Sequence, residues 1–174
     1  LRDDVVIVNL LIGTTLEAET ALWKFCFGID LMTEIQAFKR PVDDPLPRLL
    51  TDPRKLQRSV RDELWLRIVD VPAALQARSY DAEASAVIQI RDEFCSWNQG
   101  RYELDVSPDG STCGPTTRTP DLEMDISDLG AVYVGGTTLG TLMRAGRIQE
   151  SKTGAVAQLG RAFAVDGEPW IVDF

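Results

Sequence analysis

The stretch from Glu63 to Tyr80 constrains the fold of this chain most. Its segment 64–69 reads LWLRIV, and this period of two in β-favouring residues predicts a strand. Asp70 then offers a carboxylate to a helix start, and Pro72 suits the first helical turn, where its missing N–H costs no hydrogen bond. The small residues of 73–77 continue the helix. A strand that leads directly into a packed helix predicts the nucleus of an α/β layer.

The first forty residues have the pattern of strand, helix and strand. Residues 5–12 read VVIVNLLI, which is typical of a strand buried on both faces, and 32–38 could be a second strand. Thr14 and Glu17 have the spacing of a capping box. The helix that follows carries apolar residues at the positions i, i+3, i+4 and i+7, which are Leu22, Phe25, Cys26 and Ile29. Trp23 and Phe27 widen this apolar stripe. Because so short a piece cannot bury a core alone, we expect further strands of its sheet upstream of Leu1.

A proline-rich connector follows. Residues 40–53 read RPVDDPLPRLLTDP, which predicts a linker with at most a short helix at 47–51. We place the domain boundary here, with one domain ending in residues 1–45 and a second in 46–174.

The second domain has the pattern of a largely antiparallel sheet. Residues 57–60 and 64–69 could pair as a hairpin around 61–63, and Pro108-Asp109-Gly110 is a strong turn signal between two strands. The remaining expected strands are 86–90, 101–106, 111–117 and 121–126. The expected helices begin at Ser127, Thr138 and Gly154.

Charge and composition exclude several classes of function. The net charge of −9 argues against nucleic acid and anionic membranes as partners and fits cationic ligands. No apolar run reaches the roughly 18 residues of a membrane span, and the start resembles no signal peptide. Three cysteines without paired spacing predict reduced thiols in a cytoplasmic protein, with export left open. The chain has no histidine, which excludes Ser-His-Asp catalysis and histidine-bound metals.

Several blocks of the sequence resemble a known family. The chain is similar, in order, to the C-terminal part of the Eis (enhanced intracellular survival) family of aminoglycoside N-acetyltransferases. The resemblance is carried by the blocks LWKFCFGIDL, RPVDDPLPRLLTDPR, WLRIVDVPAAL, FCSWNQGRYEL, DLEMDISDLGAVYVGG and TLMRAGR. It implies an α+β fold: the end of a GNAT-like domain, followed by a sterol-carrier-protein-2-like domain with a mainly antiparallel sheet and packed helices.

The resemblance also implies the reaction and the partners. In the intact protein, acetyl would pass from acetyl-CoA to amines of aminoglycosides or other polyamines, and protein lysines are a further candidate. The expected partners are the N-terminal part of the same protein and further copies in a homo-oligomer. GNAT enzymes hold the coenzyme pyrophosphate on a sequence such as [RQ]-x-x-G-x-[GA] at a helix start, and no glycine here has Arg or Gln three positions before it. We therefore expect acetyl-CoA to bind the N-terminal domain, and this fragment alone to be inactive.

Three residues are candidates for the site on the same resemblance. The family uses its terminal carboxylate as catalytic base, which here belongs to Phe174, and the neighbouring Asp173 would contact the substrate. The turn that holds Asp62 faces the substrate pocket in the family, so Asp62 could hold a substrate ammonium. The alternatives are a tail that only anchors the fold and an ordinary solvated turn carboxylate. Tyr133 is expected to be structural rather than a catalytic acid.

Two other functions stay open for the sterol-carrier-like domain. It could bind a lipid in an apolar tunnel without any catalysis, or it could serve only to shape the oligomer. The acidic charge and the acidic tail favour the acetyltransferase, because a polyamine substrate needs negative walls.

Overall fold

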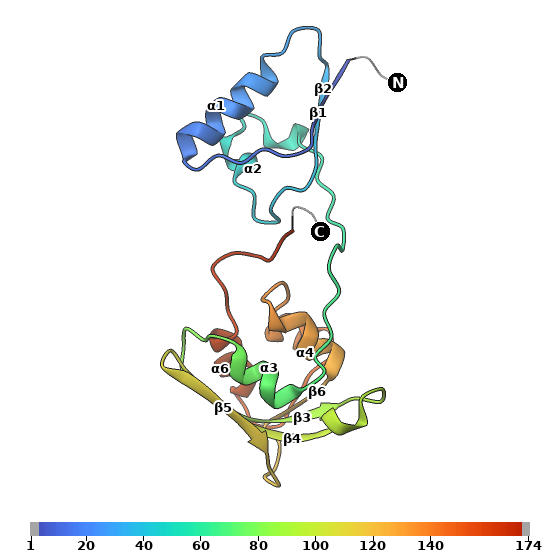
Figure 1. The fold of residues 1–174 in the computed structure, drawn as a ribbon, viewed down its shortest axis with the longest axis vertical. Coiled ribbons are helices and arrows are strands. Elements are labelled where there is room, and N and C mark those ends of the chain that lie inside the picture. Colours follow the sequence, from blue (N-terminus) through green and yellow to red (C-terminus); the bar gives the residue numbers. More distant parts are fainter. Residues whose placement is uncertain (1–3, 172–174) are drawn as a thin grey trace. The chain divides into compact units, whose positions relative to one another are not determined.

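The computed structural model describes residues 4–171. Contacts divide the chain into two compact units (Figure 1): the first holds the residues up to Leu64 together with those from Glu168, and the second is Trp65–Gly167. The chain therefore leaves the first unit once and returns to it after the second unit is complete.

The first unit contains a parallel strand pair and a helix, as expected. Strand β1 (Val5–Val8) pairs with β2 (Glu34–Ala37) in the register Val5↔Glu34, and α1 (Leu16–Phe27) connects them. The helix begins one residue later than the capping-box spacing predicted, because Thr15 rather than Thr14 accepts the hydrogen bond from Ala18 N, at 3.1 Å. The connector holds α2 (Leu46–Leu49) and the 3-10 turn η1 (Pro53–Lys55).

The predicted apolar face of α1 is wrong in part: Trp23 and Cys26 pack in the core of this unit, but Leu22 and Phe25 are exposed. Phe25 is 71% exposed, whereas Trp23 is buried and stacks on Phe27 with ring centroids 5.8 Å apart. The Arg40 guanidinium also lies over the Trp23 ring, at 5.3 Å. The indole therefore takes the inward position, since it offers the larger apolar surface.

The second unit is built on a sheet of mixed direction that is mainly antiparallel. Its strand order is β5-β4-β3-β6-β7. Ile88↔Tyr102 and Leu104↔Cys113 mark the antiparallel β3/β4 and β4/β5 registers, and β6 joins β3 in parallel. The predicted hairpin around Pro108–Gly110 is confirmed. The strands are β3 (Ala84–Arg91), β4 (Gly100–Ser107), β5 (Gly110–Pro115), β6 (Leu122–Asp125) and β7 (Gln149–Glu150).

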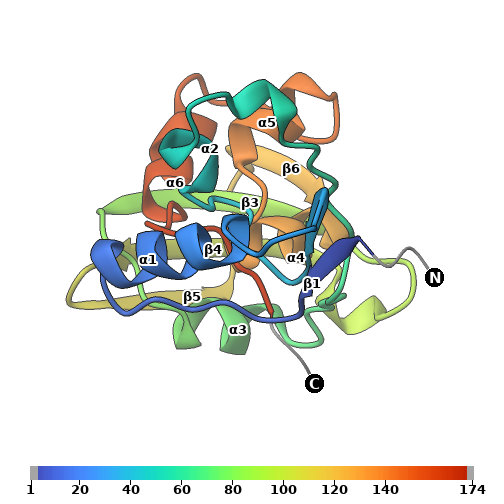
Figure 2. The same cartoon turned by 90° about the horizontal axis from the view of Figure 1, so that it is seen from above.

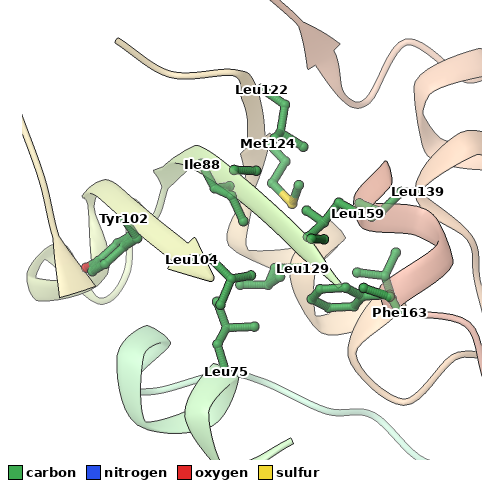
Figure 3. Close-up of a cluster of buried hydrophobic side chains, with 14 of the residues drawn as sticks. Leu75, Ile88, Tyr102, Leu104, Leu122, Met124, Leu129, Leu139, Leu159 and Phe163 are labelled. Carbon is green, nitrogen blue, oxygen red and sulfur yellow. The ribbon is translucent and has the colours of Figure 1, made fainter. Parts of the chain in front are cut away.

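Helices cover one face of this sheet. In Figure 1, α3 (Val71–Ala77), α4 (Ile126–Tyr133) and α6 (Ala155–Ala162) lie on the same side of the strands. The short α5 (Leu139–Arg144) packs beside α6 (Figure 2). The core between these layers contains Leu75, Ile88, Leu104, Leu129 and Leu159 (Figure 3).

The opposite face of the sheet is polar. It carries ion pairs and hydrogen bonds between neighbouring strands, such as Arg91–Glu123 at 2.6 Å and Arg101–Gln89 at 3.0 Å. A strand pattern with one apolar and one polar face is typical of a sheet covered on one side. The α+β expectation is therefore confirmed for this unit.

In the second unit, helix starts follow the predicted caps with one exception. The Asp70 carboxylate accepts from Ala73 N at 2.9 Å, and the Thr138 hydroxyl accepts from Thr141 N at 3.1 Å. Asp125 rather than Ser127 caps α4, because its carboxylate accepts from both the backbone and the hydroxyl of Ser127.

The predicted strand 64–69 is wrong, and so is its hairpin with 57–60. Residues 56–70 are extended but form no ladder, and Trp65 is 83% exposed while Ile68 is buried. The segment crosses α4, where a methyl group added at Gly130 would lie 3.0 Å from the Leu66 carbonyl oxygen. A period of two predicts an extended chain, but it cannot say whether a neighbouring strand is present.

Candidate functional site

Of the three predicted site residues, the structure describes only Asp62. Asp62 is exposed in the extended segment of the first unit, so the hairpin turn expected for it is absent. Asp173 and Phe174 lie outside the described residues. The roles of all three in substrate binding and catalysis stay predictions.

The chain end is described as far as Ile171. Helix α6 ends at Ala162, and the residues from Glu168 group with the first unit. Trp170 is 39% exposed.

A buried carboxylate in the second unit was missed by the sequence analysis. Asp92 directly follows β3 and is 1% exposed. One of its oxygens accepts from Arg67 Nη2 at 2.5 Å and from Cys95 N at 2.8 Å. The other accepts from Asn98 Nδ2 at 3.2 Å. Burial alone would raise the pKa of Asp92, but these hydrogen bonds and the Arg67 charge outweigh it and lower the pKa.

The Asp92 network fixes the extended segment that leads into α3. Asn98 accepts from Val71 N at 3.2 Å and donates to the Ile68 carbonyl at 3.3 Å, while Trp97 Nε1 donates to the Val69 carbonyl at 2.8 Å. Side chains from one loop thus satisfy backbone groups that a strand ladder would otherwise pair. The only signal for this network in the sequence was an aspartate at the start of a turn, immediately after a strand.

An open pocket of about 260 Å³ adjoins the same segment. Residues 66–70, the first turns of α3 and Tyr133 of α4 line it. The Tyr133 hydroxyl donates to the Ala74 carbonyl at 2.9 Å, which supports a structural role for this tyrosine. A mostly apolar pocket of this kind can accept a small apolar group.

This pocket is too small for a sterol tunnel. Ligand cavities for molecules of drug size are typically about 300–1,000 Å³, and a second open pocket, beside Asp105 and Gln158, is also about 260 Å³. The space between sheet and helices is filled by fully buried side chains such as Leu75, Ile88 and Leu104. The described residues of the second unit therefore form a packed core between the sheet and the helices.

Several other titratable groups in the second unit are held in their neutral form. Burial raises the pKa of Cys113 to about 11, and it raises the pKa of Tyr80 and of Tyr102. All three side chains belong to the core. They can therefore act neither as nucleophile nor as general acid toward a dissolved substrate.

The start of α1 does not fit the pyrophosphate of acetyl-CoA. In the first unit, α1 follows β1, but its first turn carries Glu17 and Glu19, whose charges repel an anion at the helix start. The space that a backbone cradle would need at Gly13 is filled, since a Cβ there would lie 2.5 Å from Glu19 N. No chemical step of acetyl-CoA is therefore assigned to these residues.

Residues 4–171 contain no group of three histidine, cysteine, aspartate or glutamate residues placed to hold a metal ion. None of their helices is long and apolar enough to cross a membrane.

Two known domain families match parts of this chain, and the domain boundary expected at residues 45–46 stays a prediction. Residues 71–172 match the sterol carrier protein domain, and residues 1–68 match the acetyltransferase (GNAT) domain.

Similar proteins carry N-acetyltransferase names. An uncharacterized N-acetyltransferase of Streptomyces avermitilis is 42% identical over 154 residues, which cover 88% of this chain and 38% of that protein. N-acetyltransferase Eis of Mycobacterium tuberculosis is 38% identical over 163 residues, which cover 91% of this chain and 39% of that protein. The chain thus spans about two fifths of the length of these relatives.

Solved structures of N-acetyltransferases are also similar to this chain. Eis1 from Mycobacterium abscessus superposes with a TM-score of 0.82 at 38% identity, over 97% of this chain and 43% of that one. A GCN5-related N-acetyltransferase from Anabaena variabilis, at 24% identity, shares the fold with a TM-score of 0.79, over 98% of this chain and 43% of that one. The chain belongs to the Eis family of N-acetyltransferases, with a GNAT segment followed by a sterol carrier protein domain.

Proposed function

We propose that this chain is the C-terminal part of an N-acetyltransferase that transfers acetyl from acetyl-CoA to amines of aminoglycosides or other polyamines, with protein lysines as further acceptors. The observation that carries the proposal is the 38% identity to N-acetyltransferase Eis over 91% of the chain. The chain would supply a wall of the substrate pocket, contacts of a homo-oligomer in the cytoplasm and the catalytic base.

The coenzyme would bind elsewhere in the same protein. The acidic first turn of α1 and the filled space at Gly13 support this division. The chain would therefore need its N-terminal part to acetylate any substrate.

The terminal carboxylate of Phe174 would act as the base. An ammonium group must lose a proton before its nitrogen can attack an acyl group, and the chain has no histidine to accept that proton. A free α-carboxylate has a pKa of about 3.3–3.7, and burial would raise it and make the group a stronger base. Asp173 and Asp62 would hold further ammonium groups of a polyamine, in keeping with the net charge of −9.

A non-catalytic role of the sterol carrier protein domain is the second candidate, because residues 71–172 match that family. The domain would then bind a lipid or act as a scaffold. The filled core and the pocket of about 260 Å³ favour the scaffold. Titration with a fluorescent fatty acid tests this: we expect no saturable binding, and a stoichiometric complex would support the lipid-binding role instead.

The proposed activity is tested with the full-length protein that contains this chain. Acetyl-CoA and an aminoglycoside are supplied, and thiol release is followed for that protein and for residues 1–174 alone. We expect turnover only with the full-length protein. Turnover by residues 1–174 alone would contradict the proposed division between the two parts.

A further inference from the structure

Exposed aromatic side chains gather on the second unit, around the extended segment that leads into α3. Trp65 is 83% exposed, and Phe94 and Trp97, in the loop after β3, are 82% and 69% exposed. Single exposed apolar side chains are common on monomeric proteins, but a group of large rings at one place marks an interaction surface. Tryptophan and arginine are also among the residues that contribute most to the binding energy of protein interfaces.

Contacts between the segment and the loop make this surface continuous. Trp65, Arg67 and Val69 alternate along the extended segment, and all three are exposed. The Arg67 guanidinium lies over the Phe94 ring at 5.0 Å, and Trp97 Nε1 donates to the Val69 carbonyl at 2.8 Å. These five residues form the aromatic patch.

Buried polar side chains hold the aromatic patch in one arrangement. Arg67 pairs with the carboxylate of Asp92 at 2.5 Å, while Asn98 donates to the Ile68 carbonyl at 3.3 Å and accepts from Val71 N at 3.2 Å. Because the loop and the segment are already ordered, a partner that binds here would cost them little further conformational entropy. The Asp92 charge also balances that of Arg67, so the patch needs no charged group from a partner.

A pocket beside the aromatic patch can receive a side chain of a partner. Its volume is about 260 Å³, and it is lined by residues 66–70, by Ala73 and Ala74 of α3 and by Tyr133 of α4. Most of this lining is apolar, so the pocket suits an aliphatic or aromatic side chain. The matching surface of the partner is therefore apolar, with one protruding side chain.

The size and the charge of the chain favour a partner on the same polypeptide. The three exposed rings offer roughly 350–600 Å² of apolar surface, which is less than the roughly 800 Å² that each of two separate proteins typically buries in a stable complex. A tethered partner needs less area, because its effective concentration reaches the millimolar range. Two copies of a chain with a net charge of −9 also repel each other. The chain's relatives provide such a tethered partner, since the residues matched in the Streptomyces avermitilis protein are only 38% of its length.

We propose that the aromatic patch docks on the part of the full-length protein that lies outside these 174 residues. An apolar surface of that part covers Trp65, Phe94 and Trp97 and places one side chain in the adjoining pocket. The inference rests on the proposed function in one respect, which is that this chain is part of a longer N-acetyltransferase. It assigns no catalytic role to any residue of the patch.

Hydroxyl-radical footprinting tests the docking without an activity assay. Tandem mass spectrometry measures the oxidation of Trp65, Phe94 and Trp97 in the full-length protein and in residues 1–174 alone. The partly exposed Met143 of α5 is the reference, because it lies outside the aromatic patch. We expect the three rings to be oxidised at least about fivefold more slowly in the full-length protein, since the centre of an interface excludes water, and Met143 at the same rate in both.

Three results of this experiment would overturn the inference. The first is equal oxidation of the rings in the two proteins, and the second is an equal slowing at Met143, which would reflect a general loss of access. The third is protection that decreases on about tenfold dilution, because protection by a second copy follows mass action and protection by the same polypeptide does not.

The double variant Trp65→Ala/Phe94→Ala tests whether these rings hold the docked surface. In the full-length protein it should speed the oxidation of Trp97 at least about threefold, because two neighbouring anchors are lost. In residues 1–174 alone, Trp97 should be oxidised as in the wild type. Met143→Ala is the matched control and should leave Trp97 protected. Unchanged protection of Trp97 in the double variant would overturn the inference, and the wild-type comparison decides the matter if that variant does not fold.

An acetylation assay on the same samples separates this inference from the proposed function. A full-length protein that acetylates amines while its three rings are oxidised as fast as in residues 1–174 would overturn the docking alone. Protected rings in a full-length protein that acetylates no amine would support the docking and contradict the proposed function.

Discussion

The Arg67 guanidinium lies 2.5 Å from the carboxylate of Asp92, which is 1% exposed, and the same guanidinium stacks over Phe94 at 5.0 Å. This pair joins the extended segment before α3 to the loop after β3. It replaces a strand ladder that the sequence pattern had predicted at this place.

Replacing Asp92 tests this connection. Asp92→Asn removes the charge that Arg67 faces and one acceptor oxygen, which leaves buried donors without partners and should lower the free energy of unfolding by about 1–3 kcal/mol. Glu93→Gln, at the neighbouring exposed position, should change it by no more than about 0.5 kcal/mol. Urea unfolding of both variants measures the difference, and equal midpoints would contradict the role of Asp92.

The same residue predicts a pH dependence. Because the pKa of Asp92 is lower in the folded than in the unfolded chain, its contribution is complete above the unfolded pKa of about 3.9 and is lost as the pH falls through the folded value. The stability difference between wild type and Asp92→Asn should thus be constant near neutral pH and shrink below about pH 4. A difference that grows toward acid pH would have the wrong sign.

Sequence reasoning succeeded where the signal was local. The Asp70 cap, the turn at Pro108–Gly110 and the alternating strand β4 depend on neighbouring residues, and all three are confirmed. The prediction of a strand at 64–69 failed because the backbone carbonyls of this segment accept hydrogen bonds from side chains about thirty positions away. No pattern within the segment itself encodes such partners.

The candidate site was less accessible to prediction for the same reason. Asp92 is an ordinary charged residue in the sequence, and only the fold brings it to its hydrogen-bond donors. The residues expected from the family resemblance, Asp173 and Phe174, lie outside the described residues.

The corrected position of the extended segment changes which side chains matter for stability. Ile68→Ala should cost about 2–5 kcal/mol because that side chain is buried in the core. Trp65→Ala should cost no more than about 0.5 kcal/mol, since the ring is 83% exposed. Thermal unfolding of the two variants in the same buffer and salt measures the difference in stability between them. A larger loss of stability in Trp65→Ala than in Ile68→Ala would contradict this placement of the two side chains.

Two glycines with positive φ should respond differently to alanine. Gly146 has φ 72° and open space, so Gly146→Ala should cost only about 1–2 kcal/mol of backbone strain. Gly135 has φ 90° and faces Val165, so Gly135→Ala should cost about 1–3 kcal/mol more through the clash. Adding Val165→Ala to Gly135→Ala should remove the part of the destabilisation that comes from the clash. If the double variant is no more stable than Gly135→Ala alone, the contact with Val165 is not the cause.

The cysteines should differ in reactivity. Cys113 is buried and its pKa is raised to about 11, so little thiolate forms at pH 8. Iodoacetamide should leave Cys113 unmodified in the folded chain and modify it in urea, while the half-buried Cys26 serves as internal reference. Mass spectrometry of tryptic peptides measures the extent of modification at both cysteines. Rapid labelling of Cys113 in the native chain would contradict its place in the core.

The central claim is that the terminal carboxylate of Phe174 is the catalytic base. One alanine added after Phe174 in the full-length acetyltransferase moves this carboxylate by about 3.5 Å along the chain while it keeps the charge. We predict that kcat falls by about a hundredfold or more, with folding, assembly and the KM for acetyl-CoA unchanged. A variant that folds, assembles and retains wild-type kcat would contradict the claim.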